Sequence, residues 1–220
     1  HLLKELEKQQ TSIETTCDIL RVLGEIKSQQ WKAPLIKLLR SYTSHEHPKL
    51  REQGIHTLCQ IAGSEGEDIY LSSLNDADLE VRKKAIWCLS MIKSTKGLEK
   101  MTEILKQIPT VPSPQMDQLE TQIYSAFGTF GNLKVEGKTL EQILLHIIGK
   151  RGMKQWWNPL QKNLLADTPL GTICDALGKI GTEESIKILI KLGKSRKGPW
   201  GPKLREALKK IGERSSVSTQ

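Results

Sequence analysis

The sequence has few aromatic residues and no long apolar run. Aromatic side chains make up 5% of its 220 residues and hydrophobic ones 37%, which suits thin layers of Ala, Ile and Leu better than one deep core. No stretch approaches the roughly 20 consecutive apolar residues of a membrane helix, so we expect no membrane span. No secretory signal peptide is visible, and we expect a cytoplasmic protein. Because the chain begins at His1 rather than Met, we interpret it as a domain of a larger protein or as a chain that carries a tag remnant.

Cysteine is also scarce. Each of the four cysteines falls within an expected helix, and none belongs to a Cys-x-x-Cys pair. This spacing argues against a disulfide framework, and an isolated thiol packs like a small hydrophobic residue. We therefore expect reduced core residues at Cys17, Cys59, Cys88 and Cys174.

The motifs of several common enzyme classes are missing too. The chain contains no GxxxxGK[ST] phosphate loop, no GxSxG nucleophile elbow and no HExxH zinc motif. His45-Glu46-His47 offers two imidazoles without a convincing third ligand nearby, so we expect turn residues before Pro48 rather than a metal site. His146 lies within an apolar run and is expected in the core. We predict no enzyme activity, no cofactor and no metal.

What the sequence does contain is a repeated helical frame. Apolar or small residues recur at positions i, i+4, i+8 and i+11, and an arginine follows the first position in two copies, at Arg51 and Arg82. This spacing places the apolar residues on one face of a helix. Repetition at a period of 31 to 50 residues predicts an array of stacked helical hairpins. Six copies begin at Thr15, Leu50, Val81, Leu119, Pro169 and Trp200.

The frame also predicts how the chain is divided. Asp residues in the turn 75–78 can cap the helix that follows, whereas Pro109, Pro112 and Pro114 cannot continue a helix. Expected helices cover 12–27, 31–43, 49–62, 66–74, 79–93, 97–107, 115–130, 139–149 and 154–166, with a loop at 149–152, and the last two regular repeats cover 168–193 and 200–213. The expected parts are N-terminal repeats (1–108), a Pro-rich linker (109–114), an irregular repeat with an insertion (115–167), C-terminal repeats (168–214) and a disordered tail (215–220).

Two segments resemble the HEAT-repeat consensus. One is Gly66–Ile92, with Leu74-Asn75-Asp76 and Val81-Arg82, and the other is Ile180–Leu192 with the helix that closes at Ile211-Gly212. The resemblance, which extends to phycobilisome-lyase-type repeats, implies an all-α, right-handed α-α solenoid of about six HEAT-like hairpins with one insertion. It also implies a ladder in which an Asp before the inner helix meets an Arg near its start. Asp78, Arg82 and Arg51 match those positions.

Inner helices line the concave surface of such an array. The frame leaves His56, Gln60, Trp87 and Met91 facing outward, and Trp and Met are favoured in the cores of protein interfaces. Trp87 could instead pack between inner and outer helices, and both interpretations remain open. We expect these four residues to bind a partner protein, which makes the chain a scaffold or regulatory module.

Positive charge is concentrated in the last third of the chain. Residues 150–220 contain 15 Lys/Arg and 6 Asp/Glu, a balance of +9, whereas residues 1–149 contain 18 and 19, a balance of −1. Such asymmetry predicts a partner with an acidic surface, and nucleic acid is the alternative because basic groups interleaved with Trp suit phosphates and bases. Among enzymes, the HEAT-like DNA glycosylases are the class to consider, but none of their catalytic residues can be aligned with this sequence. The basic patch would comprise Lys150, Arg151, Lys154, Lys194, Arg196, Lys197, Trp200 and Lys203.

Overall fold

A computed structural model describes residues 11–25, 29–108, 114–155, 169–195 and 201–217. The chain divides into two compact units, unit 1 (His1–Gly97) and unit 2 (Leu98–Gln220). The boundary lies within helix α7, and the division at the Pro-rich segment stays a prediction. No helix among the described residues is long and apolar enough to cross a membrane.

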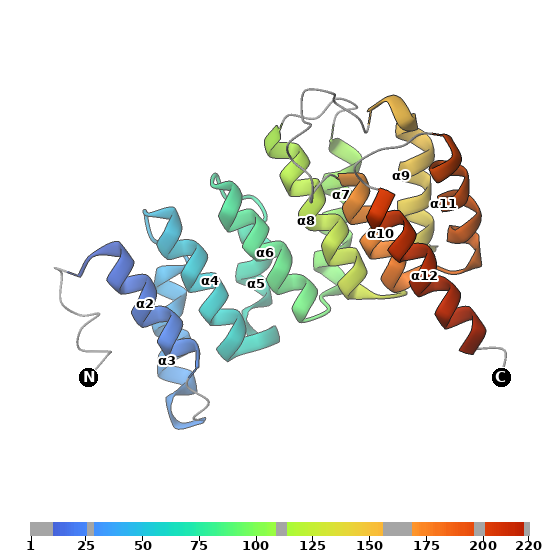
Figure 1. The fold of residues 1–220 in the computed structure, drawn as a ribbon. Helices are drawn as coiled ribbons and strands as arrows, with labels where there is room; N and C mark the ends of the chain where they lie inside the picture. The colour runs from blue at the N-terminus through green and yellow to red at the C-terminus, as the bar shows by residue number, and fades with distance from the viewer. Residues whose placement is uncertain (1–10, 26–28, 109–113, 156–168, 196–200, 218–220) are drawn as a thin grey trace. The chain divides into compact units, whose positions relative to one another are not determined.

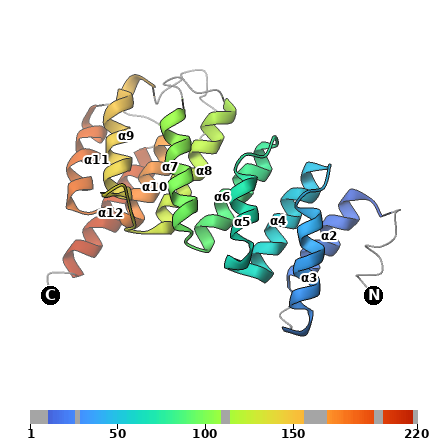
Figure 2. The ribbon, with the colours of Figure 1, turned by 180° about the vertical axis from the view of Figure 1, so that it is seen from behind.

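Unit 1 consists of two layers of helices. The inner helices α2, α4 and α6 lie side by side in Figure 1, and Figure 2 shows the outer helices α3 and α5 on the opposite side. The elements are α2 (Ile13–Gly24), α3 (Gln29–Tyr42), α4 (Pro48–Ala62), the 3-10 turn η1 (Gly63–Gly66), α5 (Glu67–Ser73), α6 (Leu79–Met91) and the start of α7 (Thr95–Gln107).

The repeated frame explains how these layers pack. In α4 and α6 the first three frame positions are buried, and the fourth is half-buried at the end of each helix. In α4 the second position must be small because a Cβ added at Gly54 would lie 3.1 Å from the backbone carbonyl carbon of Tyr42 on α3. Ala85 occupies the same position in α6 and is fully buried. Small residues at this point therefore allow close approach of neighbouring helices.

Unit 2 repeats the two-layer arrangement with an insertion. Its inner helices are α8 (Pro114–Phe130), α10 (Pro169–Ile180) and α12 (Gly201–Val217), and α10 contacts both of the others. The other layer holds most of α7, α9 (Leu140–Gln155) and α11 (Glu183–Ser195), with a hairpin of strands β1 (Lys134–Val135) and β2 (Lys138–Thr139). The strands are antiparallel, and Lys134 pairs with Thr139 while Val135 pairs with Lys138.

Several expected boundaries in unit 2 differ from the structure. The loop expected at 149–152 is wrong, because α9 continues through it to Gln155. Pro114 begins α8 rather than ending a linker, since the first helical position requires no backbone N–H. The tail expected from residue 215 is helical to Val217. Arg214 holds this end by donating hydrogen bonds to the carbonyl oxygens of Gly178 and Gly181, which close α10.

A buried carboxylate fixes α11 in this unit. Glu141 on α9 is 6% exposed, and its Oε1 accepts hydrogen bonds from the backbone N–H and hydroxyl of Thr182 at 2.7 and 2.9 Å. The Ser185 hydroxyl donates to the same oxygen. The carboxylate thus satisfies orphan donors at the N-terminus of α11 and meets the positive end of the helix dipole.

Candidate functional site

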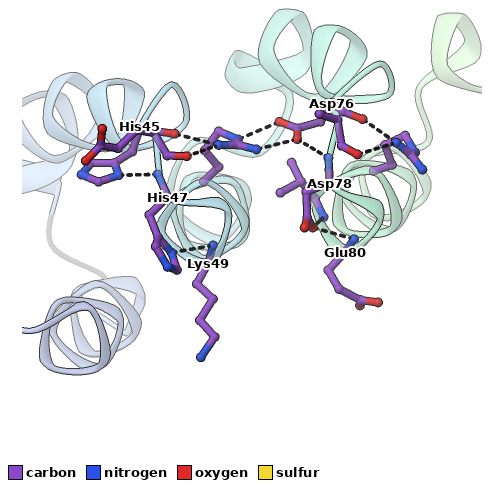
Figure 3. Close-up of polar contacts among 11 residues, drawn as sticks. His45, His47, Lys49, Asp76, Asp78 and Glu80 are labelled. Atoms are coloured by element: carbon purple, nitrogen blue, oxygen red, sulfur yellow. Dashed lines mark hydrogen bonds and ion pairs between the residues drawn. The ribbon is translucent and has the colours of Figure 1, made fainter.

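The candidate site is carried by α4 and α6, whose first turns are capped in the same way. Asp78 precedes α6, and its Oδ1 accepts hydrogen bonds from the backbone N–H groups of Glu80 and Val81 at 2.9 and 3.2 Å. His47 precedes α4, where its Nδ1 accepts from the N–H of Lys49 at 3.3 Å. Figure 3 shows the two caps in equivalent places. The imidazole therefore replaces a carboxylate as a helix cap.

The residues two positions before these caps, Asp76 and His45, also play the same part in the two turns. Asp76 Oδ1 accepts from the N–H of Asp78 at 2.8 Å, and His45 Nδ1 accepts from the N–H of His47 at 3.0 Å. Both imidazoles are thus used in local turns (Figure 3), and no group of three or more potential metal ligands occurs among the described residues. The interpretation of His45 and His47 as turn residues is confirmed.

An arginine ladder links α4 to the turn before α6. Arg51 donates from Nε and Nη2 to the two carboxylate oxygens of Asp76, each at 2.8 Å, and from Nη1 to the carbonyls of His45 and Glu46. Arg82 donates from Nη1 to the carbonyls of Asp76 and Ala77. The ladder implied by the HEAT resemblance is present, but its acceptor is Asp76, whereas Asp78 was expected. The carboxylate of Asp78 is already used by the N-terminus of α6.

The exposed faces of α4 and α6 bring part of the expected site together. The rings of His56 and Trp87 meet edge to face, with centroids 5.2 Å apart and planes at 68°. The Lys84 ammonium lies 5.8 Å from the Trp87 ring centroid, within cation–π range, and 3.4 Å from the Glu52 carboxylate. His56 and Trp87 are both half-buried. Trp87 is therefore neither fully exposed nor enclosed between layers.

The electrostatics favour a neutral imidazole in this pair. Burial, followed by the positive charge of Lys84, lowers the pKa of His56, while Glu52 opposes the shift. His56 is then uncharged at neutral pH. A neutral ring edge against an indole is a stable aromatic arrangement, so Trp87 is held in one orientation.

The other two expected residues border this pair. Met91 follows Trp87 by one helical turn and is 53% exposed. Gln60 is exposed, and its amide lies against Gly24 of α2, where a Cβ would collide with it. We call His56, Gln60, Trp87 and Met91 the ridge. The ion pair between Glu52 and Lys84 was not predicted from the sequence, although an acidic and a basic residue on successive inner helices were a signal for it.

The basic patch is described only in part. Lys194 is exposed on α11, and Lys203 on α12 forms an ion pair with Asp175 on α10 at 2.7 Å. Lys150, Arg151 and Lys154 belong to α9, but their side chains lie outside the described part. Arg196, Lys197 and Trp200 also lie outside the described residues. The patch as a whole stays a prediction.

The cysteines are the core residues that the sequence predicted, with one at the edge. Cys59, Cys88 and Cys174 are buried, Cys17 is half-buried, and all are free thiols. Burial raises the pKa of Cys174 to about 12 and raises that of Cys88 as well. Both thiols are protonated at neutral pH and are poor nucleophiles.

Comparison with known proteins supports the fold. No curated protein sequence matches the chain. The crystal structure of an engineered protein from the Northeast Structural Genomics Consortium aligns with a TM-score of 0.51 and 16% identity, covering 96% of this chain and 95% of that one. A second engineered protein from the consortium gives a TM-score of 0.47 and 17% identity, covering 96% and 57%. Residues 39–110 match the family model of HEAT repeats, so the expected HEAT-like, all-α solenoid is confirmed.

Proposed function

We propose that the protein is a non-enzymatic interaction module that holds a partner protein on the ridge of unit 1. HEAT repeats generally mediate protein–protein interactions. The observation that carries the finer assignment is the position of Met91, 53% exposed, one helical turn after the half-buried Trp87, whose ring meets that of His56 at 68°. An oriented aromatic ring beside an exposed flexible thioether is typical of an interface core.

The surroundings of this pair indicate what the partner presents. An apolar side chain would cover Trp87 and Met91, because burying their exposed apolar surface lowers the free energy of the complex. Lys84 lies beside the indole and forms an ion pair with Glu52, with their nearest atoms 3.4 Å apart. The balance of +9 over residues 150–220 would attract the partner's acidic surface at longer range. We therefore expect a partner that presents an apolar anchor to the ridge and carries an acidic region elsewhere on its surface.

Photo-crosslinking tests the location of this surface. A benzophenone amino acid is placed at position 91 on α6 and, as the matched control, at position 31 on α3, where Trp31 is 46% exposed. We expect a discrete adduct with a cellular protein from position 91 and none of the same mass from position 31. Adding Trp87→Ala should remove the adduct without changing the helical circular dichroism.

Two results would overturn the proposal. Equal adducts from positions 91 and 31 would show that labelling follows exposure alone. An adduct from position 91 that persists unchanged in the Trp87→Ala variant would place the partner elsewhere on α6. Trp31→Ala, combined with the probe at position 91, is the second control. It removes an exposed indole from α3 in the outer layer of unit 1 and should leave the adduct in place.

A further inference from the structure

A cavity of about 300 Å³ lies within unit 2 and is independent of the ridge. Its walls come from α7, α8, the β1–β2 hairpin and α9. The volume is at the lower end for ligand sites and twice the roughly 150 Å³ of an apolar cavity that accepts benzene. The space therefore suits a small molecule rather than a folded partner.

The walls of the cavity are mainly apolar. Leu105 of α7, Val135 of β1, and Ile143 and Ile147 of α9 line it, and the fully buried ring of Tyr124 from α8 also borders it. Both isoleucines are half-buried. Half-buried isoleucines beside an open cavity would gain from the contact of an apolar ligand.

Helix α9 is apolar on two faces, which corrects one expectation. Leu144 and Ile148 are buried in the unit, while Ile143 and Ile147 turn to the cavity. His146, expected in the core, is instead exposed and borders the cavity. The apolar run around His146 therefore packs into the core on one side of α9 and lines the cavity on another.

A strained turn brings charge to the edge of the cavity. Glu136 and Gly137 connect the two strands with φ angles of 51° and 77°, and this left-handed region is uncommon for a glutamate. The Glu136 carboxylate accepts hydrogen bonds from the Lys106 ammonium at 2.7 and 2.9 Å. The ion pair holds the turn against α7, and backbone strain of this kind is frequent beside binding sites.

The charges at this edge favour an anion. Lys106, Lys138 and Glu136 all border the cavity, and the charge of Lys106 is matched by Glu136. Within the described residues, Lys138 belongs to no ion pair, and it acts on Glu136 only at longer range. We propose that this cavity binds a small amphipathic carboxylate, with its apolar chain between α7 and α9 and its carboxylate at Lys138. A cationic head would instead face the Lys138 ammonium, while the Glu136 carboxylate is already paired with Lys106.

Three probes with one alkyl chain test the proposal on the 220-residue chain. Octanoate, octan-1-ol and octylamine are titrated into ¹⁵N-labelled protein, and amide shifts report where each binds. We expect saturable shifts in α7, the hairpin and α9, with octanoate bound about threefold to fivefold more tightly than octan-1-ol, the gain of one exposed ion pair. Octylamine should bind most weakly.

Matched variants separate the two parts of the site. Ile147→Trp fills the cavity and should weaken octanoate more than tenfold, whereas Ile190→Trp on α11, 42% exposed and outside the cavity, should not. Lys138→Gln should abolish the preference for octanoate over octan-1-ol, and Lys134→Gln on the other strand should leave it. Absence of saturable binding, or equal weakening by both tryptophans, would refute the site. Equal affinity for octanoate and octan-1-ol would refute the anionic ligand.

Discussion

Replacing Arg51 tests whether the ladder fixes α4 against the turn before α6. The Arg51 and Asp76 side chains are 17% and 14% exposed, and their nearest atoms are 2.8 Å apart. This pair is therefore shielded more than a surface salt bridge, which contributes about 0–1 kcal/mol. Arg51→Ala removes two charged hydrogen bonds to Asp76 and two to carbonyl oxygens.

The size of the effect follows from these contacts. Hydrogen bonds to charged groups contribute about 1.5–3 kcal/mol each, and removing one partner of a fully buried pair costs about 3–5 kcal/mol. Because the pair keeps some access to water, we expect Arg51→Ala to lower the free energy of unfolding by about 2–4 kcal/mol. Arg82→Ala is the matched control, since Arg82 donates only to two carbonyls, and should cost about 1–2 kcal/mol.

Denaturant unfolding measures both variants, and a double-mutant cycle with Asp76→Ala isolates the pair. The pH dependence has a definite sign. Burial opposes ionisation of Asp76, but hydrogen bonds from Arg51 and from the Asp78 N–H outweigh it, so the pKa of Asp76 lies below its ordinary value. Its stabilisation is complete above about pH 4 and is lost as the pH falls through the lowered folded-state pKa.

Three results would contradict this account. The first is a cost of Arg51→Ala no greater than that of Arg82→Ala, which would mean that the carboxylate contributes nothing. The second is a coupling in the cycle below about 0.5 kcal/mol, the level at which separate sites add. The third is a coupling that stays constant as the pH falls through the lowered folded-state pKa of Asp76, where protonation removes its charge.

Other positions give equally direct tests. Glu141→Gln should cost about 1–3 kcal/mol, since it weakens charged hydrogen bonds to α11, and unchanged amide exchange in α11 would contradict this. Gly178→Ala should destabilise the fold because its Cβ would lie 3.2 Å from Ala207 Cα, whereas Gly212→Ala, with open space around it, should stabilise it by about 0.5–1 kcal/mol in thermal unfolding. The protein-interaction proposal predicts no micromolar binding of labelled single- or double-stranded DNA at moderate salt. Tight binding that weakens steeply with salt and disappears on charge reversal would favour nucleic acid; the charges to reverse are those of Lys194, Arg196 and Lys197.

Much of the helical architecture could be predicted because it follows from local rules. A frame with helical period, an Asp cap and a proline at the first turn determine where a helix begins. The expected inner helices 49–62 and 79–93 differ from α4 and α6 by at most two residues at either end. These signals lie within one helix, and no knowledge of its neighbours is needed.

The features that were missed depend on neighbours or on very short elements. Each strand of the β hairpin has two residues, too few to alternate visibly, and its Glu136-Gly137 turn lacks the usual Asn-Gly or Asp-Gly signature. The sequence contained both Asp76 and Asp78, but only the geometry shows that one accepts from Arg51 while the other caps α6. His146 was placed in the core because sequence periodicity cannot distinguish two apolar faces of one helix from a single broad face.

Among the described residues of α2 and α4 no such ladder occurs, and both of its partners are replaced together. Thr16 stands where Arg51 stands in the next copy, and its hydroxyl donates to the carbonyl of Ser12 at 2.9 Å. His45 stands where Asp76 stands, and its ring stacks on Tyr42 at 6.2 Å. An arginine at position 16 would find no carboxylate at position 45 and could donate only to turn carbonyls, as Arg82 does.

The complete ladder therefore lies between the helices that carry the ridge. Arg51 ties α4 to the turn that precedes α6, and His56 and Trp87 meet across the same two helices, each about two turns from the start of its helix. A surface whose supporting helices are fixed at their N-termini loses less conformational entropy when a partner binds. Weakening the ladder should then reduce partner affinity without removing any ridge residue, and this links the stability of unit 1 to its proposed function.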